Sequence, residues 1–160
     1  MLLHLVRHAD AGDPAAWTGP DATRPLSDKG RGQADRLGSF LGGVGFRADA
    51  IITSPKLRAR ETAELVAGHL GVGVLVDDRL AGDLDLKALE AVLTDAQNPE
   101  RVVIVGHDPD FSELLEQLCD GANLPMRKGA LARIEIDRPL QPGGGTLRWL
   151  VPPDALKPGR

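Results

Sequence analysis

The sequence predicts an α/β fold: a three-layer α/β/α arrangement with a mostly parallel sheet, helices on both faces and antiparallel strands near the C-terminus. Short runs of consecutive apolar residues at 2–6 and 102–105 are typical of strands buried on both faces of a parallel sheet. Segments with the apolar spacing of helices separate these runs, and such alternation favours a parallel sheet. After residue 121 the segments alternate or carry β-branched residues, which indicates antiparallel strands.

The predicted elements follow one another with short connections. Ser27 is placed to cap a helix, which a cluster of glycines then ends. Ser54 followed by Pro55 is typical of a helix start, with the serine as cap and the proline at the first helical position. We therefore expect strands at residues 2–7, 48–53, 72–76, 101–106, 131–137 and 146–151, and helices at residues 28–42, 55–70, 86–96 and 109–119.

Two segments are expected to lack regular structure. Residues 9–26 contain glycines and prolines throughout and predict a loop. Trp17 in this loop is either a hydrophobic plug that fastens the loop or a wall of a substrate entrance, and we favour the plug. The proline-rich tail from Pro152 is expected to be loosely held.

Composition limits the class of protein. The 160 residues predict one domain with a full core, and the net charge of -4, without a basic stripe or a row of aromatic side chains, argues against nucleic-acid binding. Cys119 is the only cysteine, which excludes an intrachain disulfide and fits a reducing compartment. The first apolar run is too short for a signal peptide or a membrane span. We therefore expect a cytoplasmic protein that binds neither nucleic acid nor a membrane.

Side chains suited to phosphate follow three of the predicted strands. Arg7 and His8 come at the end of the first strand, His107 follows the strand at 101–106, and Arg58 lies in the first turn of the helix after the second strand. Open α/β sheets bind ligands beyond the carboxyl ends of their strands, and a helix N-terminus favours an anion. A guanidinium binds phosphoryl oxygens, and an imidazole can attack phosphorus. The spacing therefore indicates a phosphoryl site.

Each of these residues also has a structural interpretation. A histidine at a strand end can be satisfied by the backbone alone, and Arg58 can be a solvated helix arginine. Two histidines at the ends of two parallel strands are harder to explain in this way. We interpret His4, inside the first strand, and His69, near the end of a helix, as structural or exposed.

Motifs in the same order as in a known family strengthen the functional interpretation. The segment Leu5-Val6-Arg7-His8-Ala9 resembles the signature of the histidine phosphatase superfamily, whose usual form is Arg-His-Gly, with Ala9 in place of the glycine. The second motif places Arg58 at the phosphate-binding position and has Glu61 where glutamine is more usual. The resemblance covers almost the whole chain, and the segments that carry it are residues 5–9, 24–30, 53–62 and 105–109.

The resemblance also indicates a branch of the superfamily. The chain lacks the cap that is inserted in phosphoglycerate mutases and acid phosphatases, and in this it is similar to the SixA-type phosphohistidine phosphatases. The segment at 126–132 resembles that branch as well. The implied organisation is a single histidine phosphatase domain over residues 1–160 without a cap insertion.

The resemblance implies a covalent mechanism. His8 attacks phosphorus to form a phosphohistidine intermediate, which water hydrolyses. Arg7 and Arg58 hold the phosphoryl oxygens and disfavour the imidazolium form of His8, and His107 completes the pocket as a donor. No metal and no cofactor are implied, because cationic side chains neutralise the phosphoryl group.

The proton donor to the leaving group is open. Larger relatives use an acid after the third strand, for which Asp83 is the favoured candidate beside Asp78 and Asp85, or an acid directly after the second histidine, which is Asp108 here. Asp108 can equally be the acidic residue at the start of its helix. A phosphoramidate substrate demands less of this acid than an ester does, because its leaving imidazole can already carry a proton.

The leading hypothesis is therefore a phosphatase that removes phosphate from phosphohistidine on a phosphotransfer or phosphorelay protein. The first alternative is a small-molecule phosphate ester phosphatase of the same fold. The second is a non-catalytic phosphate-binding module, against which the complete set of Arg7, His8, Arg58 and His107 argues.

Overall fold

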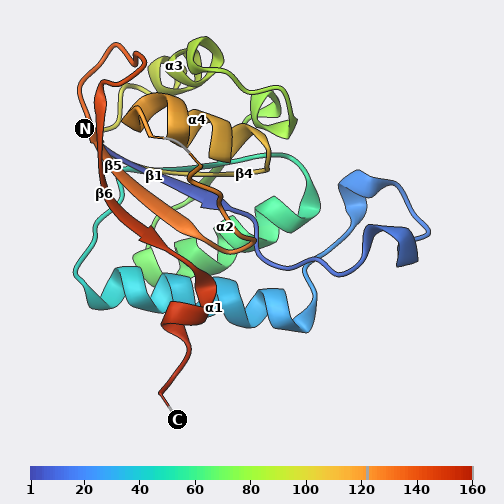
Figure 1. The fold of residues 1–160 in the computed structure, drawn as a ribbon. Coiled ribbons are helices and arrows are strands. Elements are labelled where there is room, and N and C mark those ends of the chain that lie inside the picture. Colours follow the sequence, from blue (N-terminus) through green and yellow to red (C-terminus); the bar gives the residue numbers. More distant parts are fainter. Residues whose placement is uncertain (122, 160) are drawn as a thin grey trace.

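A computed structural model describes residues 1–121 and 123–159 of the chain. Its strands form one six-stranded sheet in the order β3-β2-β4-β1-β5-β6. The first four strands are parallel to one another, whereas β5 pairs antiparallel with β1, and β6 pairs antiparallel with β5. Helices α1 and α2 cover one face of the sheet and α3 and α4 cover the other, so the predicted three-layer α/β/α class is confirmed (Figure 1).

The elements lie close to where the hydrophobic pattern placed them. The strands are β1 (Leu2–Arg7), β2 (Ala50–Thr53), β3 (Val74–Val76), β4 (Arg101–Gly106), β5 (Leu131–Ile136) and β6 (Gly145–Val151). The helices are α1 (Asp28–Gly43), α2 (Leu57–Leu70), α3 (Leu86–Asp95) and α4 (Asp110–Cys119). Short 3-10 turns are η1 (Pro14–Ala16), η2 (Asp21–Thr23), η3 (Asp78–Ala81) and η4 (Pro153–Leu156).

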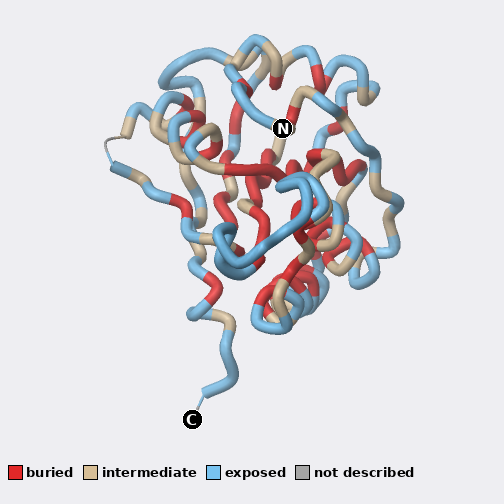
Figure 2. Tube along the Cα trace, turned by 90° about the vertical axis from the view of Figure 1, so that its right-hand side faces the viewer, coloured by how far each residue is buried: buried red, intermediate tan, exposed pale blue. Residues whose placement is uncertain are grey.

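The apolar core lies on both faces of the sheet. Because side chains alternate along a strand, Leu3 and Leu5 of β1 pack into the cluster under α3 and α4, whereas Val6 packs into the cluster under α1 and α2. All three are fully buried. Figure 2 shows the buried strands at the centre and the exposed connections around them. This two-sided core explains why the central strands are continuously apolar in sequence.

The register of the sheet sets the functional edge. Arg7 in β1 is opposite Gly106 in the parallel strand β4, so His8 and His107 leave the sheet as neighbours. The His8 N–H donates to the carbonyl oxygen of Gly106 over 2.9 Å, which ties the two strand ends together. The N–H of Ser54, at the end of β2, donates to Val105 over 3.0 Å on the other side of β4. Three carboxyl strand ends therefore meet at one edge.

Two predictions of local structure are wrong. Helix α2 begins at Leu57 and its cap position is Lys56, so Ser54 and Pro55 do not start the helix. Ser54 is fully buried, and its hydroxyl contacts His107. The tail is not loosely held over residues 153–156, where η4 packs against α1 and buries Pro153, whereas residues 157–159 are exposed. A helix-start signal reports local preference, and at Ser54 the contact with His107 overrides it.

Candidate active site

His8 is held in the form that a nucleophile needs. It directly follows β1 and is 5% exposed. Its Nδ1 lies 2.7 Å from the carbonyl oxygen of Ala9, and because a carbonyl can only accept, Nδ1 carries the proton. The lone pair therefore remains on Nε2.

The surroundings of His8 keep its ring neutral. Its pKa is lowered from 6.5 to about 4, and burial is the largest cause. The hydrogen bond to Ala9 opposes the shift, while Arg58, Arg7 and Lys128 lower the pKa further. The effect of the two arginines has the direction that the sequence predicted, but desolvation outweighs it. At pH 7 the free nitrogen of His8 is thus available.

His107 lies beside His8, with 5.2 Å between the ring centroids. Its Nε2 is 2.7 Å from the Ser54 hydroxyl oxygen. That oxygen accepts a hydrogen bond from the Lys56 N–H, so the hydroxyl can donate its own proton to Nε2 of His107. In that arrangement Nδ1 of His107 carries the ring proton, and this buried Nδ1 has no partner within the described residues. Burial and then the nearby His8 and Arg58 lower the pKa of His107 to about 3. His107 can therefore donate a hydrogen bond while remaining neutral.

Two arginines complete the arrangement. Arg7 donates from Nη1 to the carbonyl oxygen of Met126 over 2.8 Å and to Asp108 over 3.4 Å. Arg58, which is 6% exposed, donates from Nη1 and Nη2 to the carbonyl oxygen and the carboxylate of Asp21, both over 3.0 Å. The Nε atoms of Arg7 and Arg58 are buried, and in the described part of the chain neither has a partner. Such unmet donors are costly unless a ligand satisfies them.

We call Arg7, His8, Arg58 and His107 the phosphate cradle. The structure brings together all four residues that the sequence singled out: the two rings adjoin, and both arginines lie close enough to lower the pKa of His8. Three donors without partners, namely the two Nε atoms and Nδ1 of His107, belong to this group. Donors of this kind around a neutral imidazole fit a tetrahedral anion whose central atom faces Nε2 of His8.

The two candidate proton donors lie in different surroundings. The carboxylate of Asp108 accepts the N–H of Ser112 over 3.0 Å and its hydroxyl over 2.7 Å, in addition to the contact with Arg7. Asp83 is exposed in the loop between η3 and α3, and among the described hydrogen bonds none joins its side chain to the cradle. The other two acids of that loop are not placed as donors either: Asp78 is exposed at the start of η3, and Asp85 caps α3 through the Ala88 N–H.

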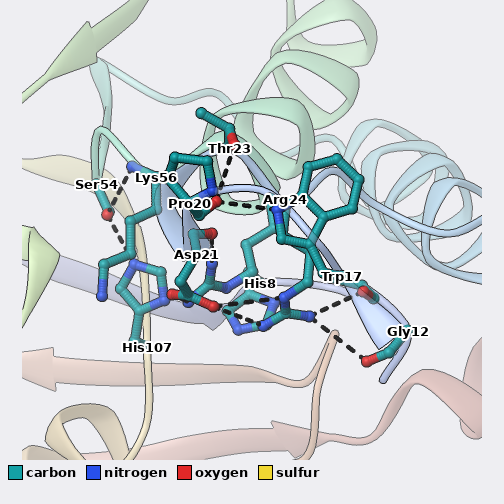
Figure 3. A network of polar contacts seen from close by, with 12 residues as sticks. His8, Gly12, Trp17, Pro20, Asp21, Thr23, Arg24, Ser54, Lys56 and His107 are labelled. Atoms are coloured by element: carbon teal, nitrogen blue, oxygen red, sulfur yellow. Dashed lines mark hydrogen bonds and ion pairs between the residues drawn. The ribbon is translucent and has the colours of Figure 1, made fainter. Parts of the chain in front are cut away.

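A residue that the sequence did not single out lies over the cradle. Asp21 reaches Arg58 from the loop at 9–26, and it also contacts Arg24 over 3.5 Å. In Figure 3 its carboxylate lies between the side chains of His107 and Arg24. Burial opposes the shift, but bonds to Arg58 and Arg24 lower the pKa of Asp21, so it is an anion at neutral pH. Arg24 is itself buried and donates to Ala11 over 2.8 Å, which folds the loop back toward the sheet.

Trp17 does not plug the core. Its side chain is 38% exposed, and its indole N–H donates to the carbonyl oxygen of Pro20 over 3.0 Å. That bond holds the loop in a local turn, while the ring lines a hollow of about 240 Å³ together with Arg24 and Leu26. The tryptophan thus fastens the loop by a hydrogen bond and leaves one face of its ring open.

The described residues offer few other functional features. Within residues 1–121 and 123–159, no group of three or more His, Cys, Asp or Glu side chains is arranged to hold a metal ion. None of the helices in the same ranges is both long and apolar enough to cross a membrane. His4 is fully buried and His69 is exposed and paired with Asp35, as the sequence predicted for these two.

Comparison with known proteins identifies the family. The model of the histidine phosphatase superfamily (branch 1) matches residues 3–97. The phosphohistidine phosphatase SixA of Escherichia coli is 29% identical over 98% of this chain and 97% of its own length, and an uncharacterized protein of Picosynechococcus is 38% identical over 76% and 74%. A structure of the protein histidine phosphatase SixA with tungstate is 28% identical and superposes with a TM-score of 0.84 over 98% of this chain and 100% of that one. The chain belongs to the histidine phosphatase superfamily and is a phosphatase of that family.

Proposed function

We propose that the protein removes the phosphoryl group from phosphohistidine on a phosphotransfer or phosphorelay protein, with His8 as the nucleophile. The observation that carries this proposal is the set of three buried donors without partners around the neutral His8 ring. The likeness to a phosphohistidine phosphatase along nearly the whole chain supports the choice of substrate.

The first step is attack of His8 Nε2 on phosphorus, in line with the bond to the leaving nitrogen. The N–P bond of the substrate breaks as the new one forms, and the electron pair goes to the leaving imidazole, which departs neutral if its other nitrogen is protonated. Charge on the equatorial oxygens is met by Arg7, Arg58 and the Nδ1 proton of His107. The hydrogen bond to Ala9 stabilises the positive charge that His8 gains.

The second step is hydrolysis of phosphorylated His8. Water attacks phosphorus from the side that the first leaving group has vacated, inorganic phosphate leaves, and the electron pair returns to Nε2. The same three donors serve again, because the transition state has the same shape and charge. The depressed pKa of His8 makes its neutral ring a good leaving group in this step.

The surroundings of the cradle favour a phosphoramidate over an ester. An alkoxide leaving group needs a strong general acid, whereas a protonated imidazole does not. The Asp108 carboxylate already accepts hydrogen bonds from Ser112 and Arg7, and the pKa of Asp21 is lowered, so neither is arranged as a protonated donor. Asp83 remains the candidate donor for any ester, through movement of its exposed loop.

The test is hydrolysis of a phosphohistidine-bearing phosphotransfer protein beside a panel of simple phosphate esters. We expect the phosphoprotein to be turned over much faster than any ester. His8→Ala should abolish turnover of both, since the nucleophile is lost, while the fold is retained. His69→Ala is the matched control, because His69 is exposed and lies on α2 away from the cradle.

Each other outcome has a clear meaning. Faster turnover of an ester would move the assignment to a metabolite phosphatase and make Asp83 the next residue to change. Wild-type rates in the His8→Ala variant would remove His8 as the nucleophile. Absence of turnover for every substrate would favour a phosphate-binding module.

A further inference from the structure

A second hollow of about 280 Å³ opens beside the phosphate cradle, and we call it the basic hollow. Arg7 lines it on the side of the cradle, and the remaining cations in its lining are Lys29 from α1 and Arg127 and Lys128 from the turn before β5. Because Arg7 belongs to both, whatever fills the hollow lies next to the phosphoryl group.

The charge of the hollow differs from that of the whole protein. Four cations and two carboxylates, Asp10 and Asp154, line it, whereas the chain carries a net charge of -4. Both carboxylates already have partners: Asp10 accepts the Ser27 hydroxyl over 2.6 Å, and Asp154 pairs with Lys157 over 2.9 Å.

Lys128 pairs with Asp10, with 3.9 Å between Nζ and the carboxylate, so one of the cations in this hollow is partly neutralised. Among the described residues, Lys29 and Arg127 form no ion pair, and both side chains are exposed. Unpaired cations concentrated at one place of an acidic protein attract anions and orient them as they approach.

The basic turn is held in place relative to the nucleophile. The N–H of Gly129 donates to the carbonyl oxygens of Arg7 and His8, over 3.1 and 3.0 Å. Arg7 in turn donates to the carbonyl oxygen of Met126 over 2.8 Å. These hydrogen bonds fix the turn at residues 126–129 beside His8, which is the geometry expected of a site that acts together with the cradle.

We propose that the basic hollow binds acidic side chains that flank the phosphohistidine on the partner protein. The proposal rests on the proposed function, because it assigns a docking site to the substrate of that reaction. The cations are spread over α1 and the turn before β5, which suits separate carboxylates on a protein surface. The polar lining includes Gln33 and no aromatic ring on which a nucleobase could stack.

The test compares a large and a small substrate in one double variant, Lys29→Ala with Arg127→Ala. For the phosphohistidine protein we expect kcat/KM to fall on the order of tenfold, mainly through KM, and its dependence on salt to weaken. For phosphoramidate, which reaches only the cradle, kinetics should be unchanged. The matched control is Arg47→Ala with Lys87→Ala, which removes two exposed cations outside the hollow.

The outcomes separate this proposal from the proposed function. If the wild type hydrolyses the phosphoprotein and the double variant does so with the same kcat/KM, the proposed function stands and the docking site is overturned. An equal fall for phosphoramidate, or for the control variant, would also overturn it, because the effect would then lie in the cradle or in net charge. If the wild-type protein hydrolyses phosphoramidate but not the phosphoprotein, both proposals fail.

Discussion

At the scale of single residues, the phosphate cradle combines neutral rings with cations that have unmet donors. His8 and His107 stay uncharged because burial makes the imidazolium costly; Arg58 adds to that cost at both rings, and Arg7 adds to it at His8. The same arginines stay charged and keep one buried nitrogen each without a partner. Burial therefore does two things here: it keeps the His8 ring neutral and leaves one donor of each arginine unpaired, both of which the proposed reaction needs.

We expect Asp21 to oppose anion binding at Arg58. Its carboxylate bonds to Arg58 over 3.0 Å and would lie close to a phosphoryl group on the same guanidinium. Asp21→Asn keeps an oxygen that accepts from Nη2 but removes the negative charge. We expect inorganic phosphate to inhibit the variant about fivefold more tightly, roughly 1 kcal/mol, because Asp21 is 57% exposed and its charge is partly screened.

The measurement for Asp21 is the inhibition constant of phosphate at pH 7 and low salt. Asp28→Asn is the control, because that exposed carboxylate pairs only with Arg31 on the surface of α1. An inhibition constant that stays the same or weakens in Asp21→Asn would show that the carboxylate positions Arg58 and does not compete with the anion.

At the scale of elements, α1 is docked tightly onto the chain that follows His8. A Cβ on Gly30 would lie 1.9 Å from the carbonyl oxygen of Asp10, and the same oxygen accepts the Ser27 N–H over 3.0 Å. Only glycine allows the first turn of α1 to come this close to residue 10. The position of residue 10, which links His8 to the loop that carries Asp21, therefore depends on the absence of a side chain at Gly30.

Gly30→Ala should therefore destabilise the protein by about 1–3 kcal/mol, as overpacking does elsewhere, despite the better helix propensity of alanine. The free energy of unfolding in urea measures the effect. Gly68→Ala is the control: Gly68 lies in α2, and a Cβ there meets nothing within 4 Å. Equal stability of the two variants would mean that the loop after His8 yields without cost.

The elements also show which features the sequence could predict. The strands that deliver His8 and His107 are short, mostly apolar runs, with His4 as the polar exception in β1, so both their position and the shared edge followed from the pattern. The contact between Ser54 and His107 could not be predicted, because the Ser54-Pro55 pair has the local form of a helix start. Asp21 lies in a 3-10 turn whose approach to Arg58 depends on tertiary contacts, and hydrophobic periodicity carries no information about these.

At the scale of the whole molecule, three buried histidines couple stability to pH. The pKa values of His4 and His8 are lowered from 6.5 to about 4, and that of His107 to about 3, in each case mainly by burial. The unfolded chain therefore binds more protons than the folded one between pH 6.5 and these lower values. The free energy of unfolding must fall as the pH drops through that window.

His4 provides the test, because it lies outside the phosphate cradle. With a folded pKa of about 4 and an unfolded value of 6.5, it contributes about 2 kcal/mol of the stability lost between pH 7 and pH 5. His4→Gln keeps an oxygen that can accept from Arg133 but cannot titrate. Urea unfolding of the variant should lose about 2 kcal/mol less over this range than the wild type does. An identical loss in both proteins would mean that His4 becomes protonated in the folded state without penalty, and acid destabilisation would then have to come from the cradle histidines alone.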